Sequence, residues 1–229
     1  MKIIDLATVV NDHCSSSSAQ CHIVKSVQII IDTLRIFGAE HTAISFNGGK
    51  DACIVLYLLI AALHTGKSSG TLDMLGNEVK VVYFVDQFEF PQMTKFLELT
   101  KATFGIHYIN LELSFKEGMA SLVDMGAQAI LMGTRVGDPY SAGLEHFSPS
   151  TSGWPAFMRV NPIIHWKYDQ VWSFIRQFDL PYCSLYDDGY TSIGNTKNSV
   201  KNPALAQPDG KFLPAYMLAD VERERDSRC

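Results

Sequence analysis

The hydrophobic and polar positions of the chain fall into alternating helical and strand patterns. Residues 22–37 carry apolar side chains at helical spacing and stop at Gly38, and 52–63 is an apolar run of helical length. Short apolar runs at 41–46 and 79–85 are typical of buried strands. Alternating strands and helices predict an α/β fold, with a mostly parallel twisted sheet covered by helices on both faces. The same patterns predict a helix at 91–104, a strand at 106–111, a helix at 114–125 with Ser114 and Glu117 as a capping box, and a strand at 129–132.

The two ends of the chain have a different texture. Residues 2–10 show helical spacing, and 11–20, with four consecutive serines, is typical of a polar connector. From 136 to 207, Pro, Gly, Ser and aromatic residues dominate, and only 168–178 has a helical pattern. A loop region this long is usually functional or disordered, and its many aromatic residues argue against disorder. We expect an ordered region shaped around a ligand, although aromatic side chains in loops also simply fill a core.

Composition narrows the class of protein. The chain has 229 residues, of which 47% are hydrophobic and 19% charged, which fits a single α/β catalytic domain over 1–229. The net charge is −5, whereas a protein that binds nucleic acid is expected to be basic. The amino terminus has no signal-peptide pattern and no apolar run is long enough to span a membrane, so we expect a cytoplasmic protein. The five cysteines are odd in number and widely spaced, which favours reduced thiols over disulfides or zinc.

The most informative stretch is Ile-Ser-Phe-Asn-Gly-Gly-Lys-Asp at 44–51, where a strand gives way to a helix. The start of a helix leaves backbone N–H groups unpaired and carries the positive end of the helix dipole, so anions bind there. Gly48 and Gly49 allow a close approach of the backbone, and Lys50 adds a positive charge. The spacing matches neither the Walker P-loop nor the dinucleotide fingerprint. Two glycines before a helix also occur in ordinary turns, so the pattern alone leaves both interpretations open.

The stretch at 45–51 resembles the signature loop of the adenine-nucleotide α-hydrolase group, whose loop grips phosphates of ATP or a related adenylate. This resemblance implies a nucleotide site at the carboxyl end of the first strand. The strand at 129–132 ends in Gly133-Thr134-Arg135, and parallel strands place ligands at this same edge. We therefore expect Gly48 and Gly133 to open on one crevice.

A second group of motifs follows the fourth strand. Asp138 precedes a proline and is held in an extended or turn conformation, where its carboxylate either faces a cation or caps its own turn. Together with later motifs it resembles the eukaryotic FAD synthase family, FMN adenylyltransferases of the phosphoadenosine-phosphosulfate reductase-like type, over 44–228. The motifs are Gly-Thr-Arg and Asp-Pro-Tyr-Ser within 133–141, Gly-Trp-Pro at 153–155, Met-Arg-Val-Asn-Pro at 158–162, Pro-Tyr-Cys-x-Leu-Tyr-Asp at 181–187 and Gly-Tyr-Thr-Ser-Ile-Gly at 189–194.

This resemblance implies that ATP and FMN, with Mg²⁺, give FAD and pyrophosphate, and it assigns roles to individual residues. The implied catalytic residues are Asn47, Asp51, Asp138 and Arg225, with Asp51 and Asp138 as metal ligands. The implied ATP- and FAD-binding residues are Ile44, Ser45, Phe46, Gly48, Gly49, Lys50, Val85, Thr134, Arg135 and Arg228. The implied flavin-binding residues are Ser152, Gly153, Trp154, Pro155 and Val160. The chain would then divide into a helical lead-in at 1–40, a nucleotide-binding core at 41–135 and a flavin-binding and C-terminal region at 136–229.

The carboxyl-terminal Glu-Arg-Asp-Ser-Arg at 224–228 is similar to the closing motif of the same family. Arg225 and Arg228 lie three residues apart, so on a helix both would reach phosphates, whereas a plain charged segment would leave them in solvent. Two positions depart from the family pattern, because Thr151 and His165 stand where Asp is frequent. Two alternatives stay open, a phosphoadenosine-phosphosulfate reductase-like enzyme, which needs a reactive cysteine, and a non-catalytic module that binds a nucleotide or a flavin.

Overall fold

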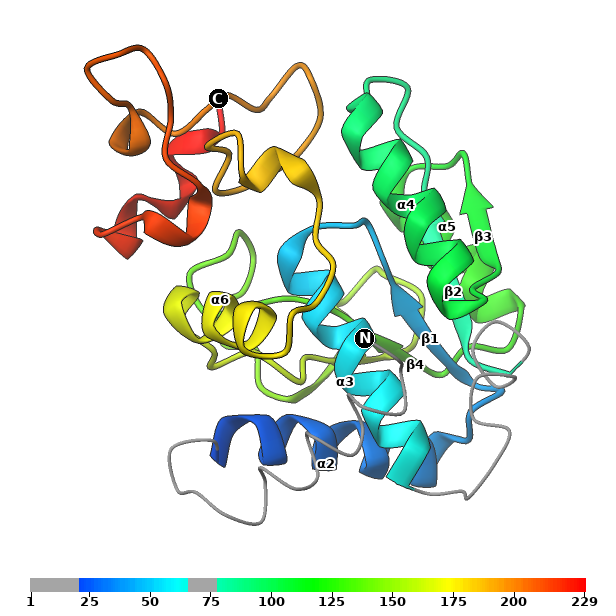
Figure 1. The fold of residues 1–229 in the computed structure, drawn as a ribbon. Coiled ribbons are helices and arrows are strands. Elements are labelled where there is room, and N and C mark those ends of the chain that lie inside the picture. The colour runs from blue at the N-terminus through cyan, green and yellow to red at the C-terminus, as the bar shows by residue number, and fades with distance from the viewer. Residues whose placement is uncertain (1–20, 66–77) are drawn as a thin grey trace.

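The computed structural model describes residues 21–65 and 78–229 and shows a sheet with helices packed against it (Figure 1). The predicted helix at 2–10 and connector at 11–20 lie outside the described residues. The first half of the described chain contains α2 (Cys21–Phe37), β1 (Thr42–Ser45), α3 (Lys50–Thr65), β2 (Lys80–Phe84), α4 (Pro91–Phe104), β3 (Tyr108–Leu111) and α5 (Phe115–Asp124). The second half contains β4 (Ala129–Leu131), β5 (Phe147–Pro149), β6 (Met158–Val160), α6 (Tyr168–Gln177) and the 3₁₀ helices η3 (Ser184–Tyr186), η4 (Pro203–Leu205), η5 (Ala215–Met217) and η6 (Val221–Ser227).

The predicted helices and strands between residues 21 and 132 are confirmed, with ends that shift by one or two residues. The capping box is present, since the Ser114 side chain accepts from the Glu117 amide and the Glu117 side chain accepts from the Ser114 amide. The interpretation of 136–207 as loops with a single helix was wrong in one respect, because β5 and β6 also lie there. Each of these strands has only three residues, which is too short for an alternating pattern to show in the sequence.

The six strands form one sheet in the order β3-β2-β1-β4-β6-β5. Every neighbouring pair is parallel except β5 with β6, so the predicted mostly parallel sheet is confirmed. Strand β1 lies centrally, and the chain adds β2 and β3 on one side of it before crossing to β4 on the other side. Open α/β sheets bind ligands at the point where the order reverses, outside the carboxyl ends of the strands. Here that point lies between β1 and β4.

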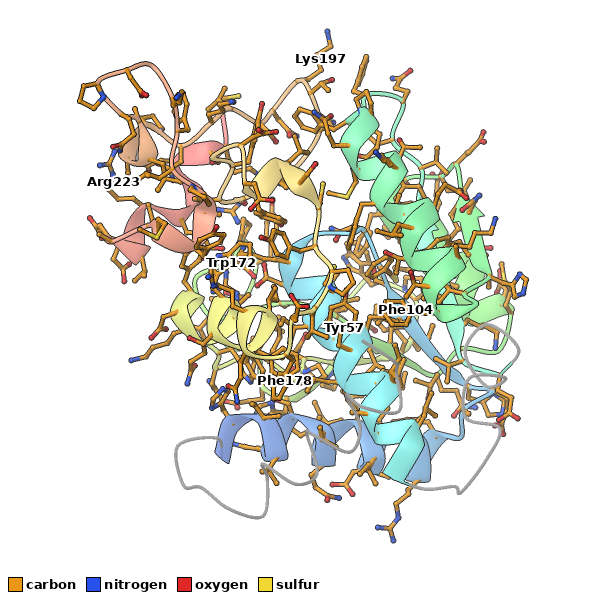
Figure 2. All side chains as sticks on the ribbon, viewed as in Figure 1. Tyr57, Phe104, Trp172, Phe178, Lys197 and Arg223 are labelled. Atoms are coloured by element: carbon orange, nitrogen blue, oxygen red, sulfur yellow. The ribbon has the colours of Figure 1, made fainter. Side chains whose placement is uncertain are left out.

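Two apolar clusters hold the sheet between its helices. The larger one includes nearly all of α3, whose side chains from Cys53 to Ala61 are at most 1% exposed, which explains why this helix is apolar on every side. Tyr57 of α3 meets Phe104 of α4 with ring centroids 5.6 Å apart (Figure 2). The smaller cluster lies on the other face of the sheet, beneath α5. Removing this much apolar surface from water is the main source of the stability of the core.

The C-terminal part, coloured orange to red in Figure 1, lies near the end at which α3 begins. Its interior contains a cluster of buried polar side chains. Thr191, Asn202 and Ser227 are fully buried, and Asn202 Nδ2 donates to Thr191 Oγ1 at 2.7 Å and to the Arg223 carbonyl at 2.8 Å. The Thr191 amide donates to Ser227 Oγ at 2.9 Å. These hydrogen bonds satisfy polar groups that would otherwise be costly to bury, and they fix the last residues against the segment that follows η3.

Candidate active site

A cavity of about 360 Å³ opens at the carboxyl ends of β1 and β4, at the reversal of strand order. The two strand ends share this crevice as predicted, with Gly133 in its lining, but at the β1 end Gly49 lines it and Gly48 does not. The C-terminal segment forms the opposite side. The residues that line the cavity are Ser45, Asn47, Gly49, Lys50, Asp51, Ala52, Phe115, Met132, Gly133, Thr134, Asp138, Pro139, Tyr186, Ser192, Ile193, Glu224, Arg225 and Arg228.

The loop between β1 and α3 presents backbone amides to this cavity. Gly48 adopts φ +72°, a left-handed conformation that only glycine adopts without strain. The Gly49 amide donates to Asn47 Oδ1 at 3.0 Å, so the Asn47 side chain braces the loop itself. The amide of Lys50 donates to the Tyr186 hydroxyl at 2.8 Å. Within the described residues, the amides of Asp51 and Ala52 have no acceptor, which leaves the positive end of the α3 dipole available to an anion.

Gly133, at the end of β4, allows the two strand ends to approach closely. A Cβ atom at this position would lie 2.8 Å from the Ala52 amide nitrogen and 2.8 Å from the Asp51 carbonyl carbon. Both are backbone atoms of the first turn of α3 and cannot move aside without displacing the helix. Only glycine therefore lets β4 end directly against the start of α3.

Beneath the loop lies a buried ionic network of two cations and two carboxylates. Lys50 Nζ lies 3.0 Å from Asp51 Oδ2 and 2.6 Å from Glu224 Oε1. Arg135 Nη2 lies 2.5 Å from the same Glu224 oxygen, and Arg135 Nε lies 2.8 Å from Asp51 Oδ1 in an ionic contact without hydrogen-bond geometry. The side chains of Lys50 and Arg135 are 2% and 6% exposed. Their charges are therefore taken up by carboxylates of the protein, whereas the family resemblance implied that both residues bind ATP or FAD.

The charge of Asp51 depends on its two cationic neighbours. Burial alone raises the pKa of this carboxyl, but the Lys50 ammonium and the Arg135 guanidinium outweigh burial, so the pKa lies below its usual value. Burial lowers the pKa of the Arg135 guanidinium, but the negative charges of Asp51 and Glu224 outweigh burial, so this pKa is raised. Asp51 and Arg135 are thus both ionised at neutral pH.

Asp138 is the third carboxylate that lines the cavity, after Asp51 and Glu224, and it meets both interpretations offered by the sequence. Its Oδ2 accepts the Arg135 amide at 2.8 Å, as in a turn that caps itself, and its Oδ1 lies 3.5 Å from Arg225 Nη1. Burial raises the pKa of Asp138, and the negative charge of Asp51 adds to this rise. A cation that binds near such a carboxyl would stabilise its ionised form.

Arg225 and Arg228 supply positive charge that the described carboxylates only partly neutralise. The side chain of Arg225 is 40% exposed and pairs only loosely with Asp138. Arg228 Nη1 lies 3.5 Å from Ser199 Oγ, and within the described residues it forms no ion pair with a carboxylate. Burial lowers the pKa of Arg228, and the charge of Arg225 lowers it further. Two neighbouring guanidinium groups of this kind favour an anion between them.

The structure does not bring every sequence-assigned residue to the cavity. The side chains of Ile44 and Phe46 are buried in the larger apolar cluster, so only the β1 backbone could touch a nucleotide there. Val85 is 40% exposed and lines a separate hollow beside α4. In the flavin-assigned stretch, Ser152 and Gly153 are exposed and Pro155 is half-buried, and none of them lines the cavity. Val160 is fully buried in β6.

Trp154 reaches the edge of the cavity indirectly, through an aromatic side chain that the sequence did not suggest. Its ring lies 6.0 Å from that of Phe115, which lines the cavity and also contacts Phe84 at 4.9 Å. Phe115 follows β3 and begins α5, so the rule that ligands gather at carboxyl ends of strands would have identified it. Other lining residues to which the sequence assigned no role are Ala52, Met132, Pro139, Tyr186, Ser192, Ile193 and Glu224.

The carboxylates of the cavity differ in how well they could hold the predicted Mg²⁺. Within the described residues, no group of three or more His, Cys, Asp or Glu side chains could hold a metal by itself. Both oxygens of Asp51 already face cations, which does not fit a metal ligand. Asp138 fits better, because Mg²⁺ in nucleotide sites is commonly held by one or two carboxylates together with substrate phosphates and water.

Comparison with known proteins places this chain in a family. A model of the phosphoadenosine phosphosulfate reductase domain matches residues 115–201. A Schizosaccharomyces pombe protein named probable FAD synthase is 36% identical over 205 residues, which cover 89% of this chain and 77% of that protein. The chain belongs to the FAD synthase family. A second FAD synthase relative, from Caenorhabditis briggsae, is 35% identical over 88% of this chain, but the match spans only 39% of that longer protein.

The fold of this FAD synthase family member also matches a solved structure. The Candida glabrata FMN adenylyltransferase in complex with FAD and inorganic pyrophosphate superposes with a TM-score of 0.84 at 21% identity, over 100% of this chain and 98% of that one. At this identity the likeness supports the fold. Within residues 21–65 and 78–229, no helix combines the length and the apolar character that crossing a membrane requires.

Proposed function

We propose that this chain is an FMN adenylyltransferase that makes FAD and pyrophosphate from ATP and FMN. The observation that carries this proposal is the convergence of three anion-binding features on one cavity: the start of α3, Arg225 and Arg228. Membership of the FAD synthase family supports the same reaction. Because the chain spans less than half of the Caenorhabditis briggsae relative, the proposal concerns the adenylyl transfer alone.

The reaction asks mainly for positive charge and alignment. A phosphate oxygen of FMN attacks the α-phosphorus of ATP, a P–O bond forms, and the bond to pyrophosphate breaks. The FMN phosphate is already an anionic nucleophile at neutral pH, so no general base is required. The free amides at the start of α3 would bind triphosphate oxygens, and Arg225 and Arg228 would neutralise charge that builds up in the transition state. Asn47, which braces the loop, would keep those amides oriented.

Mg²⁺ is proposed as the metal, with Asp138 as the carboxylate that holds it beside the substrate phosphates. When bound, Mg²⁺ supplies Lewis-acid stabilisation of charge on the phosphate oxygens. The raised pKa of Asp138 fits this role, because a bound cation favours the ionised form of that carboxyl. For Asp51 we propose a different role from the one inferred from sequence. With both oxygens paired, Asp51 would orient Lys50 and Arg135 beneath the loop.

The two halves of the cavity would serve the two substrates. Ser45 and Thr134 line it beside the strand ends, so we propose that residues 41–135 hold the nucleotide. Phe115 and Trp154 form an aromatic edge on the side of the loop between β5 and β6, which supports placing the flavin on residues 136–229 with Phe115 added. A cytoplasmic location, and the lack of nucleic-acid and membrane partners, stay predictions from the sequence.

The reductase alternative needs a reactive thiol near the bound nucleotide. Cys53 and Cys183 are fully buried. Burial raises the pKa of the Cys53 thiol well above its usual value, and burial raises the pKa of the Cys183 thiol to about 11. Cys229 is exposed but does not line the cavity. None of these three described thiols suits the reductase reaction.

One assay separates the three candidate functions. The protein is incubated with ATP, FMN and Mg²⁺, and the products are separated by chromatography, with flavin fluorescence and pyrophosphate as independent readouts. FAD and pyrophosphate in equal amounts would establish the proposed function. Sulfite release from an adenylyl sulfate with thioredoxin would establish the reductase. Binding of ATP or FMN without any product would leave a binding module and refute the proposal.

A further inference from the structure

Glu224 occupies a distinctive place in the cavity, although neither the sequence motifs nor the proposed reaction gives it a task. One of its oxygens, Oε1, accepts from Lys50 Nζ at 2.6 Å and from Arg135 Nη2 at 2.5 Å. The two donors come from the start of α3 and the end of β4, and Glu224 comes from η6, 174 residues after Lys50. The Glu224 side chain therefore joins the two strand ends that form the nucleotide site to the last helical segment of the chain.

This contact is buried and balanced in charge. The Glu224 side chain is 14% exposed, and the Lys50 ammonium lies over the rings of Tyr168 and Tyr186, at 5.4 and 5.9 Å from their centroids. Lys50 and Arg135 are offset by Asp51 and Glu224, so the network is neutral as a whole. Without the Glu224 carboxylate, two buried cations would share the single charge of Asp51, which is strongly unfavourable in surroundings that exclude water.

The same segment carries the two guanidinium groups that face the cavity. Arg225 follows Glu224 directly, and Arg228 lies three residues after Arg225. The Glu224 backbone is held as well, because Thr191 Oγ1 donates to the Glu224 carbonyl at 2.6 Å. The side-chain contacts of Glu224 thus hold η6 against the start of α3 and the end of β4. The backbone contact holds η6 against Thr191. Both contacts exist in the protein without ligand.

We infer that Glu224 is the positioning residue that docks the C-terminal segment onto the phosphate-binding loop, so that Arg225 and Arg228 are held ready for the triphosphate. This inference rests on the proposed function only for the identity of the ligand. Lys50 and Arg135, to which the family resemblance gave a ligand-binding role, then act as the two donors that hold Glu224. Prearranged arginines spare the ligand the entropic cost of ordering them at the moment of binding.

A double-mutant cycle on ATP affinity tests whether Glu224 acts through the arginines. Glu224→Gln keeps the size of the side chain and removes its charge, and should weaken ATP binding on the order of 10-fold, as expected when contacts to charged groups are lost. In a background that carries Arg225→Ala and Arg228→Ala, the same change should alter the dissociation constant by less than about 2-fold, because the groups it positions are absent. Equal losses in both backgrounds would overturn the inference, since a general folding defect acts in either.

Two further variants on the same segment sharpen the cycle. Glu224→Asp keeps the carboxylate and should recover most of the affinity lost in Glu224→Gln. Glu222→Gln removes an exposed carboxylate from the same 3₁₀ helix and should bind ATP like the wild type. If Glu222→Gln weakens binding as much as Glu224→Gln does, the effect comes from net charge and the positioning role is wrong.

A measurement on the unmodified protein covers the case in which the Glu224 variants do not fold. Hydrogen exchange without ligand, followed by mass spectrometry, should show amides of 221–228 protected relative to an unstructured peptide. Exchange at the rate of a free peptide would overturn the inference, because the segment would not be docked before ATP binds. These outcomes are separate from the proposed function, which fails only if the wild-type protein makes no FAD.

Discussion

The two sides of the cavity are built by different physical means. The core wall presents mainly backbone amides at the ends of a sheet that is buried on both faces, and it is made of Ser45, Asn47, Gly49–Ala52 and Met132–Thr134. The C-terminal wall, made of Ser192, Ile193 and residues 224–228, presents arginine side chains from 3₁₀ and irregular structure. The core wall rests on apolar burial, whereas the C-terminal wall rests on buried hydrogen bonds and ion pairs.

Because of this difference, we expect the core wall to be rigid and the C-terminal wall to be adjustable. Amides at a helix start cannot leave without unfolding α3, so the core wall offers a fixed anion site. The guanidinium groups can move through their side-chain torsions and depend on other side chains to hold them in place. We therefore expect substitutions in the C-terminal wall to change catalysis or affinity at little cost in stability, and substitutions in the core wall to change both. The following predictions test this contrast, from the largest expected effect to the smallest.

Arg225→Ala should lower the rate of FAD formation by about 10²- to 10³-fold, which corresponds to roughly 2.7–4 kcal/mol of lost transition-state stabilisation for one oxyanion donor. The thermal midpoint should hardly change, because this side chain is 40% exposed. Single-turnover kinetics at saturating ATP and FMN measure the effect.

The matched control is Arg223→Ala on the same 3₁₀ helix. Arg223 pairs with Asp226 at 2.8 Å and lies on the C-terminal segment away from α3 (Figure 2). Its loss should leave the rate within about 2-fold of the wild type, since an exposed ion pair contributes little. Similar rate losses in the two variants would mean that net charge, and not the position of Arg225, accounts for the effect.

Asp51→Asn should lower the free energy of unfolding by about 3 kcal/mol at pH 7, because it breaks a partly buried ion pair. The pKa of Asp51 in the folded protein lies below its usual 3.8, so ionised Asp51 stabilises the fold above that value, and this contribution is lost as pH falls through the lower folded pKa. Urea unfolding at pH 7 and near pH 3 should show the difference between wild type and variant shrinking in acid.

A difference that stays constant between these two pH values would contradict the pairing of Asp51 with Lys50 and Arg135. Asp187→Asn is a suitable control, because its carboxylate accepts from the exposed Tyr182 hydroxyl and lies outside the network. It should change the unfolding free energy by less than about 1 kcal/mol at either pH, since one partly solvated hydrogen bond is at stake.

Asn202→Ala should lower the free energy of unfolding by about 1–3 kcal/mol, because it leaves buried partners of the amide without a hydrogen bond. The Asn202 amide donates to Thr191 Oγ1 and to the Arg223 carbonyl, and its oxygen accepts from the Ala204 amide. Hydrogen exchange should show the loss confined to the C-terminal part, with α3 still protected. Uniform deprotection of the core would show instead that the two walls unfold as one unit.

The sequence predicts the core wall better than it predicts the contacts of the C-terminal wall. Strands and helices up to residue 132 could be predicted because apolar periodicity decides them locally, and the shared crevice follows from the rule for parallel strands. The partners of Lys50 could not be predicted, since Glu224 is distant in sequence and nothing local marks a buried ammonium. Arg135 was assigned to the ligand for the same reason. The strands β5 and β6 were missed because three residues carry no readable pattern.

Gly194→Ala should weaken ATP binding by roughly 10-fold, or about 1.4 kcal/mol, with little change in stability. A Cβ at this position would lie 1.8 Å from Arg228 Nη1 and 2.1 Å from Asn198 Oδ1, which are the ends of side chains that can turn aside. The Arg228 guanidinium would leave the cavity while the backbone keeps its course. Isothermal titration with ATP, paired with a thermal melt, measures both quantities.

Gly133→Ala is the matched substitution in the core wall, and it should behave in the opposite way. Its Cβ would meet backbone atoms of Asp51 and Ala52 at 2.8 Å, so relief requires moving the first turn of α3 itself. We expect a loss of about 1–3 kcal/mol in unfolding free energy, as for other overpacked sites, together with weaker ATP binding. If both alanine variants lost affinity and stability in equal proportion, the two walls would not differ in the way inferred from their contacts.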